Sequence, residues 1–258
     1  MMTMHLLLAA LFCISLSPSR VFAAARPGDQ RKRRFVDYLN PHLRSQDHAE
    51  TRVRVVGGNA DALQDVRELF IEQRLDHFAQ SGSAALPTRT FRQRYFYSDR
   101  YVSSNEKRAS YAFLCMGGEG PSLTRHVLVD SVHCSGDMLE LASLLHTHYG
   151  LDVHLYALEH RYYGQSYPEF DDGTSPVSNT NLRYLSSRQA LADMAHFVST
   201  AIHQGESGAE SNTRVITFGG SYPGMLSAWS RLKYPHLIYA AVSSSSPVQA
   251  QLDFPEIQ

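Results

Sequence analysis

The sequence predicts an α/β protein built on a mostly parallel sheet with flanking helices. Between residues 90 and 242, short apolar runs alternate with longer segments of helical spacing. This alternation is typical of βαβ units. The apolar runs are continuous, as expected for strands that are covered on both faces. In such sheets the chemistry sits at the carboxyl ends of the strands, so functional residues are expected in the loops that follow these runs.

The expected elements follow from local periodicity. Strands are predicted at Thr90–Tyr97, Tyr111–Met116, Val153–Leu158, Arg214–Phe218 and Ile238–Val242. Alternation and dense aromatic residues mark the first of them, and continuous apolar runs mark the others. Helices are predicted at Leu139–Tyr149, Arg188–His203 and Met225–Leu232. For Val66–Phe78 two interpretations stay open, an amphipathic helix and an irregular entry segment.

The N-terminus has the features of a targeting segment. Leu6–Leu16 is an apolar run, and the small residues Ala23, Ala24 and Ala25 follow it, as a signal-peptidase site requires. The run is too short for a membrane span, which needs about 20 residues. We therefore expect residues 1–24 to be a signal peptide. The protein would then enter the secretory pathway and reach an extracellular, lysosomal or vacuolar destination.

Residues 25–64 are polar and basic, and we interpret them as a pro-region or linker before a domain at 65–258. The run Arg31–Arg34 within them is either a solvated tail or a processing site. Signal-peptide cleavage would remove Cys13 and leave Cys115 and Cys134, which could pair in an oxidising compartment. Whether they pair is open at this stage.

Composition restricts the function classes. The chain has 258 residues, 43% of them hydrophobic, which is enough for one sizeable core. Its formal net charge of −1 gives no reason to expect nucleic acid as a partner. No membrane-spanning run is expected after residue 25, and the oligomeric state is not predicted.

The loop after the Arg214–Phe218 strand carries the strongest chemical signal. It reads Gly219-Gly220-Ser221-Tyr222-Pro223-Gly224 and leads directly into a predicted helix. A glycine-flanked serine between a strand and a helix is typical of a nucleophile elbow, the strained turn of α/β-hydrolases. Small residues are expected just before Ser221 and two residues after it, where Pro223 departs from the usual glycine. Ser221 is the predicted nucleophile, and the backbone N–H of Tyr222 a predicted oxyanion donor.

A second oxyanion donor is expected in the loop after Met116. This loop reads Gly117-Gly118-Glu119-Gly120, and its glycines would let a backbone N–H, that of Gly118, approach the reacting oxygen. The absence of a following Lys-Ser/Thr argues against a phosphate-binding loop. Glu119 is interpreted as a residue that either orients the loop or binds a positive group of the substrate, such as a peptide N-terminus.

The loop after Leu158 reads Glu159-His160-Arg161-Tyr162-Tyr163-Gly164. It should lie near the site because it follows another strand. His160 precedes Ser221 in the chain, whereas in this fold the catalytic His follows the Ser and the acid. We therefore expect structural roles for His160 and Arg161.

These motifs together resemble one peptidase family, that of prolyl carboxypeptidase, dipeptidyl-peptidase II and thymus-specific serine protease. The resembling strings are Gln73–Phe78, Phe91–Phe96, Gly117–Gly120, Glu159–Gly164, Gly219–Tyr222, Ala228-Trp229, Lys233–His236 and Ser246–Val248. The resemblance implies an α/β-hydrolase fold and a serine exopeptidase acting on peptide ends, often next to proline. It implies acyl transfer through Ser221, with no metal or organic cofactor.

The other two members of the triad are not expected in this chain. After Ser221 come only one His, His236, and one Asp, Asp253, in the reverse of the order that this fold uses. His236 is interpreted as a helix-end residue that points away from the site. The fold is thus expected to be truncated after the nucleophile helix and the following strand, and the chain alone to lack efficient triad catalysis.

Two alternatives to a serine peptidase stay open. A lipase or esterase would use the same elbow, because the elbow does not set the leaving group. A catalytically dead binding protein would keep the fold without the triad.

Overall fold

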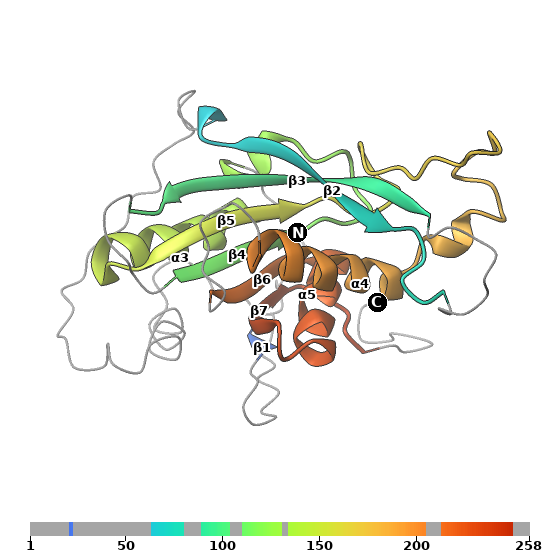
Figure 1. The fold of residues 1–258 in the computed structure, drawn as a ribbon. Coiled ribbons are helices and arrows are strands. Elements are labelled where there is room, and N and C mark those ends of the chain that lie inside the picture. The colour runs from blue at the N-terminus through green and yellow to red at the C-terminus, as the bar shows by residue number, and fades with distance from the viewer. Residues whose placement is uncertain are drawn as a thin grey trace, which may run out of the picture.

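A computed structural model describes residues 21–22, 63–79, 89–103, 110–130, 134–204 and 213–249. These residues form a seven-stranded sheet with helices packed against it (Figure 1). The expected signal peptide, apart from residues 21–22, lies outside the described residues. So do the Arg31–Arg34 run, Cys13 and Asp253.

The elements follow the predicted alternation. The strands are β1 (Val21–Phe22), β2 (Arg67–Arg74), β3 (Thr90–Tyr101), β4 (Ser110–Met116), β5 (Asp152–Leu158), β6 (Arg214–Gly220) and β7 (Ile238–Ser244). The α-helices are α3 (Ser135–Tyr149), α4 (Ser187–Phe197) and α5 (Ser221–Lys233). A π-helical turn, η4 (Val198–Ile202), continues α4, and two 3₁₀ turns, η2 (Arg125–Leu128) and η3 (Leu182–Tyr184), lie in the connections.

The sheet has the order β1-β7-β6-β4-β5-β3-β2. Strands β7, β6, β4 and β5 are mutually parallel, β3 is antiparallel to β5, and β2 is antiparallel to β3. The predicted α/β class and mostly parallel sheet are therefore confirmed. Because β4 lies between β5 and β6, the loops that follow these three strands meet at one edge of the sheet.

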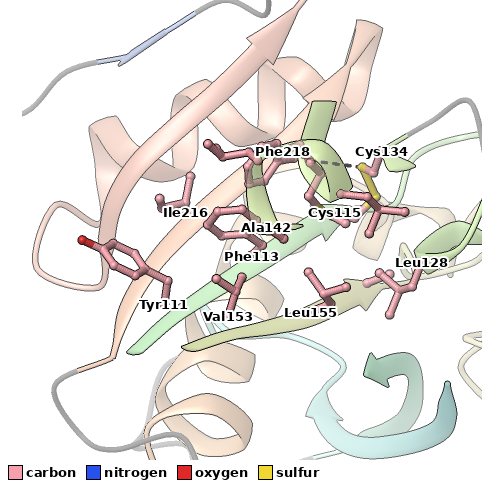
Figure 2. Packing of buried hydrophobic residues seen from close by; sticks show 14 of the residues in the cluster. Tyr111, Phe113, Cys115, Leu128, Cys134, Ala142, Val153, Leu155, Ile216 and Phe218 are labelled. Carbon is pink, nitrogen blue, oxygen red and sulfur yellow. Dashed lines mark hydrogen bonds between the residues drawn. A yellow bond between two sulfur atoms is a disulfide. The ribbon is translucent and has the colours of Figure 1, made fainter. Parts of the chain in front are cut away.

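Helices cover both faces of the sheet. Alternate side chains of β4 point to opposite faces and pack against different helices. Phe113 and Cys115 point to the face covered by α3, where they pack with Met138 and Ala142 (Figure 2). Leu114 and its even-numbered neighbours pack instead in the cluster formed with α4 and α5, which lie side by side (Figure 1). Burial on both faces explains why these strands are continuously apolar.

Local signals set two of the helix ends. Helix α4 begins after Ser186, whose side chain accepts a hydrogen bond from the backbone N–H of Gln189. Helix α3 ends at Gly150, which takes the left-handed conformation with φ 61° that favours glycine at a helix end.

Neither interpretation of Val66–Phe78 was right, because Arg67–Arg74 forms strand β2. It pairs with β3 from Arg67 opposite Tyr97 to Arg74 opposite Thr90. As the last strand of the described sheet it is only partly buried, so it shows neither the continuous apolar run of a central strand nor a clean alternation. Its side chains contact those of β3, and the guanidinium of Arg92 on β3 lies 4.3 Å from the centre of the Phe70 ring on β2.

Cys115 and Cys134 form a disulfide, which answers the question that the sequence left open. The bond joins the penultimate residue of β4 to the residue before α3, and it lies inside the core cluster on that face (Figure 2). It therefore fixes the start of α3 close to the strand whose carboxyl end leads into the Gly117–Gly120 loop.

Candidate active site

Ser221 lies at the junction of β6 and α5 with a backbone φ of 56°. This left-handed conformation costs a residue other than glycine about 1–2 kcal/mol, and such strain is the mark of a nucleophile elbow. The side chain is exposed, and α5 starts at Ser221 itself rather than at Met225 as the periodicity predicted. The first backbone N–H groups of the helix are therefore free of intrahelical partners and face the site.

The glycines around Ser221 are required at two positions. A Cβ on Gly219 would lie 2.3 Å from the Pro223 carbonyl oxygen, and one on Gly224 would lie 1.9 Å from Ser246 Oγ. A Cβ on Gly220 would meet only the Ser244 oxygen at 3.8 Å, which is an ordinary contact. The expectation of crowding just before Ser221 and two residues after it therefore needs correction. The crowded positions are two before and three after, and Pro223 is accommodated.

A buried polar seam holds α5 against the sheet. Ser227 Oγ bonds to Thr217 Oγ1 of β6 at 2.8 Å and donates to the Val242 carbonyl of β7 at 3.0 Å. Ser243 Oγ donates to the Gly224 carbonyl in the first turn of α5 at 2.8 Å. Small hydroxyl side chains allow a close approach of helix and sheet and satisfy each other's polar groups. The seam therefore fixes the height of the elbow above the strands.

The Gly117–Gly120 loop touches the elbow directly. A Cβ on Gly118 would lie 2.4 Å from Pro223 Cγ, so only glycine allows this contact. Gly117 donates its N–H to the Leu158 carbonyl at 2.8 Å, and a Cβ there would lie 2.5 Å from the same oxygen. Glu119, by contrast, is exposed. The two loops that were predicted to supply oxyanion donors are thus in contact, with Gly118 beside the turn that carries Ser221 and Tyr222.

Glu159 is a buried anchor for the loops at this edge of the sheet. One oxygen, Oε1, accepts from Arg94 Nη2 at 2.6 Å and from the Leu123 N–H at 3.0 Å. The other oxygen, Oε2, accepts from the Gln165 N–H and Ser166 Oγ, each at 2.9 Å. Since Leu123 continues the chain from the Gly117–Gly120 loop, the carboxylate ties that loop to β3 and to the loop after β5.

Arg161 is fully buried and uses all five of its N–H donors. It makes a two-point ion pair with Asp193 of α4, with both N···O distances 2.7 Å. The remaining donors reach three backbone carbonyls, those of Leu75, Tyr184 and Arg74. His77 Nε2 lies 2.7 Å from Asp193 Oδ1 as well. The expected structural role of Arg161 agrees with this geometry, in which it joins the end of β2, η3 and α4.

His160 contacts Tyr222, the residue after Ser221, rather than Ser221 itself. Its Nε2 lies 3.0 Å from the Tyr222 hydroxyl, and its Nδ1 lies 2.8 Å from the Arg161 carbonyl. Both ring nitrogens are thus engaged, in agreement with a structural role. Burial lowers the pKa of His160 below its ordinary value. Burial, together with the negative charge of Glu119, raises the pKa of Tyr222 to about 12.

His236 lies at the opposite end of the sheet from Ser221. It follows α5 in the turn that leads into β7, and its side chain is exposed beside Tyr234. Helix α5 has 13 residues and therefore separates the two ends by about 20 Å at 1.5 Å per residue.

Sequence reasoning missed two residues of this site, Arg94 and Asp193. Arg94 lies in the string Phe91–Phe96, which carried no assigned role. Asp193 lies on a helix face predicted only from apolar spacing. A charged residue at a buried position of an otherwise apolar pattern was the available signal, since such groups are rarely buried unless paired.

Residues 73–258 match the family described as serine carboxypeptidase S28. The chain belongs to this family. Mouse thymus-specific serine protease is 39% identical to it over 188 residues, which cover 72% of this chain and 31% of the mouse protein. Human lysosomal Pro-X carboxypeptidase is 36% identical over 180 residues, covering 70% of this chain and 32% of the human protein. The resemblance noted in the sequence is confirmed, and the chain spans about a third of the length of these relatives.

Among solved structures, the peroxisomal α/β-hydrolase Lpx1 of Saccharomyces cerevisiae aligns with a TM-score of 0.45 at 11% identity, covering 74% of this chain and 48% of that chain. Within the described ranges, no helix is long and apolar enough to cross a membrane.

Proposed function

We propose that this S28 chain carries the nucleophile of a serine exopeptidase that hydrolyses peptides by acyl transfer. Ser221 attacks the scissile carbonyl, and the backbone N–H groups of Tyr222 and Gly118 stabilise the oxyanion that forms. The observation that carries the proposal is the left-handed φ of 56° at Ser221, at the junction of a parallel strand and a helix. The contact of Gly118 with Pro223 adds to it, because it brings both donor loops to one point.

The general base and the carboxylate that orients it are proposed to lie outside the described residues. Serine is a weak nucleophile unless a neighbouring base removes its proton. His160 has both nitrogens engaged, and His236 lies at the other end of the sheet. The proposed chemistry therefore needs a His and an Asp that the described residues do not place at Ser221.

Exopeptidase specificity is proposed from the relatives and from Glu119. The human relative is named a Pro-X carboxypeptidase, and both it and the mouse thymus-specific protease have names of proteolytic enzymes. In this chain the exposed Glu119 brings a negative charge close enough to Tyr222 to act on its pKa. A carboxylate near Tyr222 attracts a cationic group, such as the free amino end of a peptide, and repels a free carboxyl end. Glu119 therefore favours action at the amino end of a peptide over the carboxypeptidase mode in the name of the human relative. We therefore propose Glu119 as a substrate-binding residue.

Secretory or lysosomal localisation is proposed on two grounds. The Cys115–Cys134 disulfide persists in oxidising compartments and is rare in the cytosol. The human relative is named lysosomal. Removal of residues 1–24 as a signal peptide belongs to the same proposal.

A fluorophosphonate probe tests the nucleophile in the protein expressed from its complete gene. Wild type should label and hydrolyse peptides, and Ser221→Ala should do neither, while Ser199→Ala, a serine on η4, should match wild type. Persistent labelling of the folded Ser221→Ala variant would contradict the assignment of Ser221 as the nucleophile. Folded wild type that neither labels nor cleaves peptides would point instead to a binding protein.

The specificity assignment has its own assay. Glu119→Gln should lower kcat/KM for peptides with a free amino end and leave peptides with an acetylated end unchanged. An equal effect on both substrate sets would remove Glu119 from substrate recognition.

A further inference from the structure

The Tyr222 side chain reaches across the site to the loop after β5. Tyr222 follows Ser221 in α5, which starts at the end of β6, whereas His160 follows β5. Strand β4 lies between these two strands in the sheet. The 3.0 Å contact between the Tyr222 hydroxyl and His160 Nε2 therefore spans the position at which the Gly117–Gly120 loop leaves β4.

The hydrogen-bond partners fix the tautomer of His160. A backbone carbonyl only accepts, so Nδ1 must carry the proton and donate to the Arg161 oxygen at 2.8 Å. In the neutral ring Nε2 is then an acceptor, and the Tyr222 hydroxyl donates to it. A protonated ring would lose this acceptor. Donation from the Tyr222 hydroxyl to Nε2 therefore requires a neutral His160 ring.

The surroundings of His160 keep the ring in place. Tyr163 and Tyr222 contact it edge-on, with ring centroids 5.4 Å and 5.6 Å from its own. On the backbone side, a Cβ on Gly117 would lie 2.8 Å from the His160 nitrogen, so the Gly117–Gly120 loop packs tightly there. The next residue, Arg161, is held by its five donated hydrogen bonds. These contacts therefore hold the acceptor nitrogen, His160 Nε2, in a fixed position.

We infer that His160 is a positioning residue that holds Tyr222, and through it the oxyanion N–H beside Ser221, by accepting the Tyr222 hydroxyl hydrogen bond. The inference rests on the proposed function, because it acts on the oxyanion donor of the Ser221 reaction. The charged groups that bear on His160 are Arg161, Asp193 and Glu119. Burial outweighs the two carboxylates and lowers the pKa of the imidazole, which favours the neutral acceptor form.

The expected kinetic signature follows from when the donor acts. An oxyanion donor stabilises charge that appears only in the transition state, so a misplaced donor lowers kcat and leaves KM nearly unchanged. One hydrogen bond of net strength near 1 kcal/mol corresponds to about a fivefold loss of kcat.

Two substitutions at His160 separate the two nitrogens. The Gln side chain can place an acceptor near the position of Nε2, and the Asn side chain can place a donor near that of Nδ1. We expect H160Q to keep most of the kcat of the protein expressed from its complete gene. H160N and Y222F should each lose about fivefold with unchanged KM. In the double variant H160N/Y222F the losses should not add, because both substitutions remove the same hydrogen bond.

Controls separate this inference from stability and from the proposed function. Y163F keeps the ring contact with His160 and should retain wild-type kcat. Thermal unfolding of each variant gives the amount of folded protein, to which kcat is normalised. Equal kcat for Y222F and wild type, additive losses in the double variant, or equal losses in H160Q and H160N would overturn the inference. Activity that survives Ser221→Ala would instead overturn the proposed function.

Discussion

Gly164 offers a test of how strongly the Glu159 anchor contributes to stability. Its φ of +56° lies in the left-handed region, and a Cβ there would lie 1.9 Å from Glu159 Oε1 and 2.7 Å from Ser122 Oγ. Gly164→Ala therefore imposes two costs, a backbone cost and a collision with a buried carboxylate. Gly173 has a φ of +69° and nothing within 4 Å of a built Cβ, so Gly173→Ala imposes the backbone cost alone.

The magnitudes follow from the contacts. The left-handed conformation costs alanine about 1–2 kcal/mol, which is the expected loss of unfolding free energy for Gly173→Ala. In Gly164→Ala the Glu159 carboxylate must also move from its ion pair with Arg94, whose shortest N···O distance is 2.6 Å. Disrupting a buried pair costs about 3–5 kcal/mol, so we expect Gly164→Ala to lose at least ~3 kcal/mol more than Gly173→Ala.

Equilibrium urea unfolding measures both losses through the fluorescence of Trp229, the single tryptophan, on α5. Gly120→Ala is a further control, because nothing lies within 4 Å of its built Cβ and its φ is outside the left-handed region. Equal losses for Gly164→Ala and Gly173→Ala would refute the reasoning, since they would mean that Glu159 relaxes without cost.

Three further stability predictions use the same unfolding assay. Replacing Cys115 and Cys134 by Ser opens a link across 19 residues and should cost about 3 kcal/mol; no change on reduction of wild type would contradict this. Arg161→Lys keeps the charge but cannot supply five donors, and should cost about 3–5 kcal/mol, whereas a loss under about 1 kcal/mol would show that Arg161 is not an anchor. Burial lowers the pKa of His154, so on acidification the unfolded chain takes up a proton at this residue before the folded chain does. The free energy of unfolding should therefore fall as pH drops below about 6.5. His154→Gln should lessen this fall, and an unchanged pH profile in the variant would exclude His154 as its source.

The central strands and the strained turn at Ser221 could be predicted because their causes are local. Burial on both faces makes β4, β5 and β6 continuous apolar runs, and the strained turn at Ser221 needs glycines within three residues of it. Strand β2 could not be predicted, because its pairing with β3 decides its conformation and its own pattern does not.

The anchors of the site were hidden for a different reason. Glu159 pairs with Arg94 across 65 positions, and Arg161 pairs with Asp193 across 32. No periodicity within either segment indicates such a partner. The role of His160 depended in the same way on Tyr222, which lies 62 positions away and whose hydroxyl reaches it only once β5 and β6 are placed in one sheet.

The contact of Gly118 with Pro223 links two loops that are 105 positions apart, and it predicts that the two positions co-vary among S28 proteins. Pro223 occupies the place that glycine holds in the usual elbow, and its ring fills the space that a side chain at 118 would need. A relative with glycine at the position of Pro223 should tolerate alanine at the position of Gly118, whereas a relative that keeps the proline should not. An alignment of the family would thus carry a two-position signature of this contact, readable without any structure.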